Sequence, residues 1–393
     1  MLTVFQQGFL RIVRAGVKNE KQVLPEGFDT ERLFDAAKMH HLIGIVYNGA
    51  VLCGIDKELP VMKKLFLGTL KEAAVHERQK HEFEQIKRKF NELGIDYMPI
   101  KGVLIKELYP EPSIRYMNDV DILIRDRDYG IIKKAISNFG YTYRCESSHE
   151  YIWTKAGVLI LELHKSLVSS RNEDFYGYFG DGWDKAVKKG EYEYGLNPED
   201  EFIYTFCHFT KHYRYCGVGV KYIIDLFMYR KNKKLDYEYI ERELEKIGIL
   251  EFYRNIQKVI ECWFEDSNMD EKTEFISDFI IISGVYGRHE NEIASLVLQK
   301  KTNGYDFGTS SKVKLFVMRA FPTLSVMKVH YKYLEKLGFL LPFAWVCRWF
   351  NALLKKRKNI AKHIKDIKRV NDKDVEDLRR KLEYVGLDFK FKE

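Results

Sequence analysis

The sequence predicts an α+β protein in which a small mixed-sheet core is flanked by an N-terminal and a C-terminal helical region. Hydrophobic residues recur with helical spacing over residues 1–94 and again over residues 196–393. Residues 95–195 instead contain short runs of alternating apolar and polar residues, which are typical of strands. We therefore expect three units with these boundaries.

Both flanking regions carry helix signals. In the N-terminal region we expect a helix to about residue 18, a second near residues 29–53, and a long third one over residues 61–93, where Gly94 ends it. The C-terminal region opens with Asn197 as the helix cap, a proline in the first helical position and three acidic residues in the first turn. From there, helices are expected nearly to the end of the chain.

The central region alternates between strands and helices. A strand at residues 95–100 leads through Lys101 and Gly102 into a short helix, and a second strand covers residues 118–126. Beyond these we expect a helix over residues 127–140 and then three strands, at residues 141–147, 150–157 and 158–167.

Composition and charge indicate which kinds of molecule the protein surface could bind. The 393 residues are 46% hydrophobic and 31% charged, within the range of ordinary globular proteins. The net charge is +8, but residues 355–369 hold eight Lys or Arg against one Asp, so the remainder carries only +1. A body-wide basic surface for nucleic acid is therefore not indicated.

The C-terminal segment and the cysteines indicate where in the cell the protein is expected. The apolar run before the basic segment contains Pro342 and Arg348 and is shorter than the ~20 residues of a membrane span. Residues 338–369 either bind an anionic membrane surface or an acidic partner, or form an internal helix followed by a solvated basic one. The six cysteines are scattered with no C-x-x-C pair. The expected location is cytoplasmic, with attachment to a membrane surface as a further option.

Two carboxylates on the second strand form the main candidate site. Asp119 and Asp121 are two residues apart, so on a strand they share one face while Val120 and Ile122 point to the other. Two carboxylates at this spacing can each hold one of two divalent cations, and hard oxygen ligands select Mg²⁺ or Mn²⁺. The alternative is that both are ordinary acids at a strand edge or turn.

A third acid lies on a later strand. Glu162 and His164 share one face of that strand, and leucines form the other face. An unpaired buried carboxylate is costly, so Glu162 is expected either to bind metal with the two aspartates or to pair with a basic neighbour.

Three residues near the aspartates are candidate phosphate contacts. Gly102, after Lys101, allows close approach of the backbone, and the free N–H groups of a helix start can bind phosphate. The same turn also occurs in ordinary strand-to-helix connections. Arg115 either neutralises phosphate charge or pairs with one of the carboxylates.

The first helix of the C-terminal region adds a possible basic cluster. His208, Lys211 and His212 lie off its apolar stripe, either as a solvated face or as groups that face the nucleotide or the acceptor. A zinc site is a poor interpretation, because no Glu follows the first His. Asp225, within an apolar run, must have a donor, for which Lys211, Lys221 or His212 would serve.

The run from Ile100 to Ile124, IKGVLIKELYPEPSIRYMNDVDILI, resembles the uncharacterised nucleotidyltransferases of the polymerase-beta-like nucleotidyltransferase superfamily. It has their Lys-Gly, a Tyr-Pro turn, an Arg and then Asp-x-Asp in a hydrophobic strand, and the later Glu-Leu-His is similar to their third-acid strand. The resemblance is good over residues 96–165 and looser over 206–225 and 321–350, and the first 90 residues contribute little. The Lys-Gly pair departs from the superfamily's commoner Gly-Ser or Gly-Gly turn.

This resemblance implies a site that binds a nucleoside triphosphate such as ATP and two metal ions. Asp119 and Asp121 would be metal ligands, and Gly102 the turn at the phosphates. Glu162 would ligate a metal or accept the proton of the acceptor hydroxyl. The implied reaction transfers a nucleoside monophosphate to an acceptor and releases pyrophosphate. The acceptor is left open among a sugar phosphate, a protein side chain, a nucleic-acid end and a small molecule.

Two other functions remain as alternatives. A glycosyltransferase could use Asp-x-Asp to bind a nucleotide-sugar through Mn²⁺, but its fold would need several strand-helix units before that motif, and here one strand precedes it. A catalytically silent nucleotide-binding or scaffold protein on a membrane is the second alternative. All three acids are present, so nothing in the sequence supports a loss of catalysis.

Overall fold

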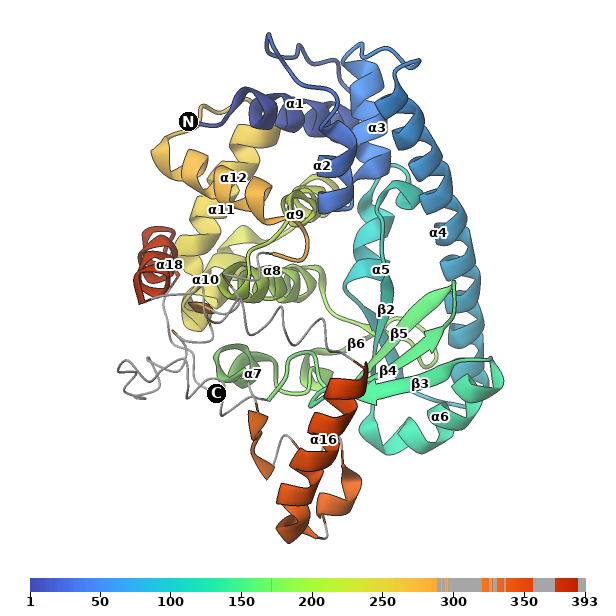
Figure 1. The fold of residues 1–393 in the computed structure, drawn as a ribbon. Coiled ribbons are helices and arrows are strands. Elements are labelled where there is room, and N and C mark those ends of the chain that lie inside the picture. Colours follow the sequence, from blue (N-terminus) through green and yellow to red (C-terminus); the bar gives the residue numbers. More distant parts are fainter. Residues whose placement is uncertain are drawn as a thin grey trace.

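The computed structural model describes residues 1–170, 172–287, 331–335, 337–355 and 372–387, together with residues 291, 294, 295, 298, 320–324 and 327. It confirms the predicted fold class, because a five-stranded mixed sheet lies between helices from both ends of the chain (Figure 1). The basic segment over residues 356–369 lies outside the described residues.

The N-terminal region contains four helices, α1 (Val4–Lys18), α2 (Leu33–His40), α3 (Ile43–Leu52) and α4 (Pro60–Glu92). The single helix expected near residues 29–53 was wrong, because His41 adopts a left-handed conformation with φ 55° and separates α2 from α3. Helices α1 and α3 pack at close range, since a Cβ added to Gly49 would overlap the carbonyl oxygen of Ile12.

The five predicted strands of the central region are confirmed. They are β1 (Tyr97–Ile100), β2 (Asp119–Ile124), β3 (Thr142–Glu146), β4 (Glu150–Lys155) and β5 (Leu159–His164), in the order β1-β2-β5-β4-β3. The β2–β5 pair is parallel and the other pairs are antiparallel. The helix between β2 and β3 is α6 (Tyr129–Asn138), and a short hairpin, β6 (Val187–Lys188) with β7 (Tyr194–Gly195), was not predicted.

The two faces of the sheet have different coverings. On one face, Val120 and Ile122 of β2 and Leu161 of β5 join a core with Phe90 of α4 and Ile136 of α6. The other face bears the acids, and its apolar members belong to the larger core that includes the C-terminal helices. The period-2 alternation along β2 and β5 therefore sends apolar residues to one core and carboxylates to the opposite side.

The described helices that follow the five-stranded sheet in the chain are α7 (Glu173–Phe179), α8 (Pro198–Tyr215), α9 (Val220–Asn232), α10 (Tyr237–Ile247), α11 (Leu250–Phe264), α12 (Glu271–Ser283), α16 (Leu341–Lys355) and α18 (Asp372–Tyr384). As predicted, Asn197 caps α8, since its side chain accepts a 2.7 Å hydrogen bond from the Asp200 amide. Helices α8 and α9 lie centrally, between the sheet and the more distant α11 and α12 (Figure 1).

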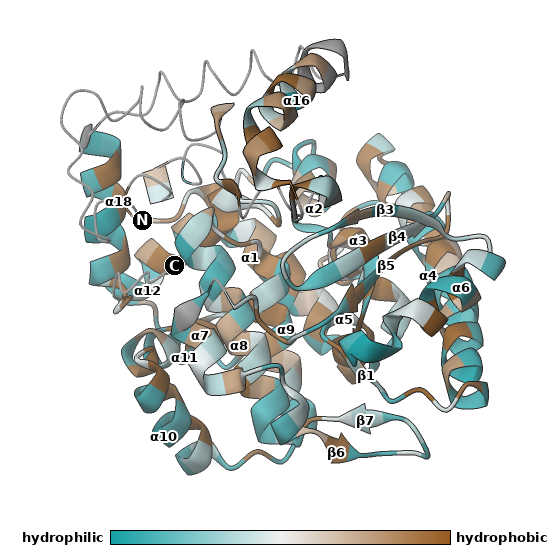
Figure 2. Ribbon diagram, turned by 90° about the horizontal axis from the view of Figure 1, so that it is seen from below, coloured by the Kyte–Doolittle hydropathy of each residue, from teal (hydrophilic) through white to brown (hydrophobic). Residues whose placement is uncertain are grey.

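Helix α16 carries exposed apolar side chains. Phe339, just before it, and Phe343 and Phe350 within it are 76%, 61% and 64% exposed, and the helix is coloured as largely hydrophobic in Figure 2. No helix in the described ranges is long and apolar enough to cross a membrane. Binding of residues 338–369 to a membrane surface or an acidic partner stays a prediction.

Candidate active site

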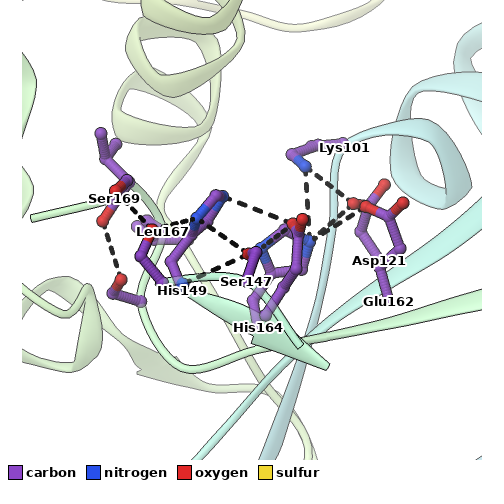
Figure 3. A network of polar contacts seen from close by, with 12 residues as sticks. Lys101, Asp121, Ser147, His149, Glu162, His164, Leu167 and Ser169 are labelled. Carbon is purple, nitrogen blue, oxygen red and sulfur yellow. Dashed lines mark hydrogen bonds and ion pairs between the residues drawn. The ribbon is translucent and has the colours of Figure 1, made fainter. Parts of the chain in front are cut away.

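Register brings the acids of β2 and β5 together. Asp121 and Glu162 are direct partners in the parallel pair, so their side chains project side by side from one face. His164, two residues after Glu162, joins them, and ligand atoms of the three residues all lie within 4.8 Å of one another (Figure 3). The predicted convergence of Glu162 with Asp121 is thus observed.

Asp119 completes the acidic face. It precedes Asp121 by two residues on β2 and lines the same cavity as Asp121 and Glu162. Burial, and then the negative charges of Asp121 and Glu162, raise the pKa of Asp119 to about 6. The ionised form of the Asp119 carboxyl is therefore disfavoured, and a nearby cation would stabilise it.

Lys101 is fixed against the acids. Its Nζ lies 2.7 Å from Oδ1 of Asp121, and Nε2 of His164 lies 2.8 Å from the same oxygen. Burial alone would raise the pKa of Asp121, but the Lys101 charge and the His164 hydrogen bond hold it well below its usual range. Lys101 itself has φ 56° and ψ −122°, where β1 turns into the four-residue helix α5 (Gly102–Ile105).

A cavity of about 500 Å³ opens between this face and helices α8 and α9. Lys211 of α8 and Lys221 of α9 line it opposite the acids. Burial lowers the pKa of both lysines. The positive charge of Lys101 lowers the pKa of Lys211 further. The positive charge of Arg115 acts in the same way on Lys221, whose pKa is lowered to about 8. Within the part of the chain described here, neither lysine forms an ion pair with a carboxylate. The cavity thus presents positive charge that an anionic ligand could neutralise.

The two histidines of α8 are not on a solvated face. His208 and His212 line the cavity, with ring centroids 4.5 Å apart. Burial lowers the pKa of His208 well below its usual range and that of His212 to about 3. Both rings are therefore neutral at pH 7, so the histidines add no charge to the expected basic cluster.

Arg115 pairs with Asp225, and not with Asp119 or Asp121, the two carboxylates for which pairing was expected. Its Nε and Nη2 donate to Oδ1 and Oδ2 of Asp225, at 2.7 and 2.8 Å, and the hydroxyl of Tyr109 donates to Oδ1 at 2.7 Å. The expected buried ion pair of Asp225 is confirmed, but the prediction that Lys211, Lys221 or His212 would be the donor was wrong. Arg115 also donates to the Gly102 carbonyl at 3.3 Å, so it ties α9 to the turn beside the acids.

Several residues of the site were missed from the sequence. His164 was placed on the correct face without a role, and Lys221 was considered only as a partner for Asp225. His149 and Glu150, which also line the cavity, were not considered. The hairpin order of β4 and β5 could have indicated them, because consecutive antiparallel strands place Glu150 directly opposite His164.

One comparison with known proteins identifies the family of the chain. A family model described as "Uncharacterised nucleotidyltransferase" matches residues 26–265, more than half of the chain, and the chain belongs to this family. The match starts well before residue 90 and stops before 321–350, so the resemblance extends further toward the N-terminus than expected. No curated protein and no solved structure matches the chain.

Proposed function

We propose that this protein transfers a nucleoside monophosphate from a nucleoside triphosphate, such as ATP, to an acceptor hydroxyl and releases pyrophosphate. The observation that carries the proposal is the cavity itself. Three carboxylates, those of Asp119, Asp121 and Glu162, line one side of it. Lys211 and Lys221, which form no ion pair with any described residue, line the other. Anionic phosphates with divalent cations would complement both sides.

The donor set suits hard divalent cations. Carboxylate oxygens are the ligands that Mg²⁺ and Mn²⁺ prefer. Burial, and then the charges of Asp121 and Glu162, raise the pKa of Asp119, so a bound cation would favour its ionised form. Asp119 and Asp121 would hold two Mg²⁺ ions, and Glu162 would share them. When bound, such ions would neutralise the developing charge on the attacking and leaving oxygens.

The remaining roles follow from position. Lys211 and Lys221 would bind the phosphates from the helical side of the cavity and would need little rearrangement, because both are already partly buried. Lys101 and His164 orient Asp121 through its Oδ1, which leaves Oδ2 free for a cation. Glu162, exposed to the cavity, would accept the proton of the attacking hydroxyl.

Family membership favours this function over the two alternatives. A glycosyltransferase with an Asp-x-Asp motif would require a different fold around it. A silent nucleotide-binding protein would share the site but not the reaction, so a test must separate binding from transfer.

The experiment uses the full chain with each α-labelled nucleoside triphosphate, Mg²⁺, and a panel of sugar phosphates, proteins, nucleic-acid ends and small hydroxyl compounds. We expect Mg²⁺-dependent thermal stabilisation by the nucleotide and transfer of label to one acceptor class. Asp119→Asn should lose transfer, whereas Asp56→Asn, at an acid remote from the cavity lining, should retain it. Unchanged transfer by Asp119→Asn would overturn the proposal, and Mg²⁺-dependent binding without any transfer would favour the silent alternative.

A further inference from the structure

One nitrogen of His164 forms no hydrogen bond with any residue that the structure describes. His164 is 1% exposed, and among the described residues its Nδ1 is one of the few buried polar atoms without a hydrogen bond. Its other nitrogen, Nε2, lies 2.8 Å from Oδ1 of Asp121. An ionised carboxylate only accepts hydrogen bonds, so Nε2 must carry the proton, and in the neutral ring Nδ1 is an unshared lone pair.

Two further ligand atoms face that lone pair. Glu150 is the cross-strand partner of His164, and its Oε2 lies 3.8 Å from Nδ1 of His164. The same oxygen lies 3.4 Å from Nε2 of His149. Ligand atoms of the three residues all lie within 4.8 Å of one another. Figure 3 shows His149 on the side of His164 away from Asp121.

The backbone holds the three residues rigidly. Glu150 and His164 are paired across the β4–β5 ladder, and the amide of Lys165 donates to the carbonyl of His149 at 2.7 Å. The hydroxyls of Ser147 and Ser148 lie 3.5 and 3.4 Å from Nδ1 of His149, which directs its Nε2 toward Glu150. Strand pairing thus sets the backbone positions of Glu150 and His164, and a backbone hydrogen bond that of His149.

We propose that His149, Glu150 and His164 bind one divalent transition-metal ion of the Zn²⁺ type, next to but separate from the acidic face. Two imidazoles and one carboxylate form a borderline donor set that suits such an ion, whereas Mg²⁺ prefers oxygen ligands alone. A fourth position would open to the cavity, which His149 and Glu150 both line. The Asp121–His164 hydrogen bond would have the role of the carboxylate that orients a metal-binding histidine.

This arrangement links the two sites through one ring. Asp121 belongs to the proposed Mg²⁺ site through one oxygen and orients His164 through the other. The same Nε2 cannot donate to Asp121 and also ligate a metal, so His164 serves the site with His149 and Glu150 and not one with Asp121 and Glu162. The inference does not depend on the proposed reaction, because it concerns metal binding in the absence of nucleotide.

The test measures Zn²⁺ binding to the chelator-treated full-length protein by competition with a chromogenic zinc indicator, and the visible absorption of the Co²⁺ form. We expect one ion per chain at a site that excess Mg²⁺ does not displace. Glu150→Gln and His149→Ala should each weaken Zn²⁺ binding by at least about tenfold and change the Co²⁺ spectrum. Circular dichroism of the metal-free variants would show that each is folded.

Glu162→Gln is the matched control, because it removes an equivalent charge from the acidic face on the other side of His164. It should bind Zn²⁺ as the original chain does, and so should His212→Ala. If the original chain binds no Zn²⁺, or if Glu150→Gln and His149→Ala bind it unchanged, the proposal is wrong. It is also wrong if Glu162→Gln loses the ion while Glu150→Gln keeps it, since the metal would then lie among the acids.

Discussion

At the scale of single residues, the two aspartates of β2 are not equivalent, although the sequence presents them as a symmetric pair. Asp121 is 4% exposed, and its carboxylate contacts both Lys101 and His164. Asp119 is partly exposed, and the charges with the largest effect on its pKa are the negative charges of Asp121 and Glu162. Their substitutions should therefore differ in effect on stability while sharing an effect on catalysis.

We expect Asp119→Asn to abolish nucleotidyl transfer and to leave the free energy of unfolding unchanged or raised by up to about 1 kcal/mol, because it removes repulsion. Asp121→Asn should abolish transfer and also destabilise the fold by about 3–5 kcal/mol, because it leaves Lys101 buried without its counter-charge. Urea unfolding of both variants in the absence of metal is the measurement. Equal stabilities would show that the Lys101–Asp121 pair contributes nothing to the fold.

His40 predicts a pH dependence away from the site. Its Nε2 lies 3.0 Å from the carbonyl of Ile281, and the amide of Val220 donates to its Nδ1 at 3.2 Å, so the neutral ring joins three helices. Burial lowers its pKa to about 4 from the usual 6.5. The unfolded chain therefore binds this proton more readily, and stability should be complete above pH 6.5 and decrease as the pH falls toward 4.

The expected loss from His40 alone is about 3 kcal/mol at the acid end of that range. Other buried histidines contribute as well, so the measurement is the difference between the original chain and His40→Gln. The variant should be less stable at pH 7 and should lose stability less steeply between pH 6.5 and 4. Parallel pH curves would mean that His40 does not titrate between the folded and unfolded states.

At the scale of elements, the contact between α1 and α3 depends on two glycines. A Cβ on Gly49 would overlap the carbonyl of Ile12, and one on Gly16 would overlap that of Ile45. In contrast, a Cβ on Gly130 of α6 would meet no atom within 4 Å.

Gly49→Ala should therefore destabilise the protein by about 1–3 kcal/mol through forced separation of the two helices. Gly130→Ala, the matched control within a helix, should leave stability unchanged or raise it by up to about 1 kcal/mol, because alanine is the better helix former. Thermal unfolding of both variants measures this difference. A similar effect of both substitutions would show that helix propensity, not close packing, determines the outcome at Gly49.

The elements also show what a sequence can predict. Alternation located all five sheet strands and placed Asp119, Asp121 and Glu162 on the side opposite their apolar neighbours, because side-chain period is a local property. The break at His41 escaped prediction, since no glycine or proline marks it. The Arg115–Asp225 pair also escaped prediction. Its two residues are 110 positions apart in the sequence, and they meet because α9 packs against the segment that precedes β2.

At the scale of the whole molecule, the site depends on how the sheet and the C-terminal helices meet. The acids come from β2 and β5, and Lys211 and Lys221 come from α8 and α9, so neither unit alone forms the cavity. A ligand that contacts both should stabilise them together, in a single unfolding transition.

Lys211→Ala tests whether the ligand contacts the helical side of the cavity. If Lys211 binds phosphate equally in the ground and transition states, the substitution should raise the KM for nucleotide more than it lowers kcat. Stability should change little, because Lys211 has no ion pair among the described residues. Unchanged nucleotide affinity with a lower melting temperature would instead assign Lys211 a purely structural role. Lys188→Ala, at an exposed lysine of β6, is the control for loss of charge.

The backbone of Lys101 is strained at the position whose side chain pairs with Asp121. Its φ of 56° is one that glycine adopts freely and that a residue with a Cβ adopts at a cost of about 1–3 kcal/mol. Lys101→Gly should therefore be more stable than Lys101→Ala, although both lose the ammonium group that holds Asp121. Relief of this strain is smaller than the about 3–5 kcal/mol expected from breaking the Lys101–Asp121 pair, so both variants should be less stable than the original chain. The chain thus keeps a lysine in a backbone conformation suited to glycine, because the ion pair outweighs the strain.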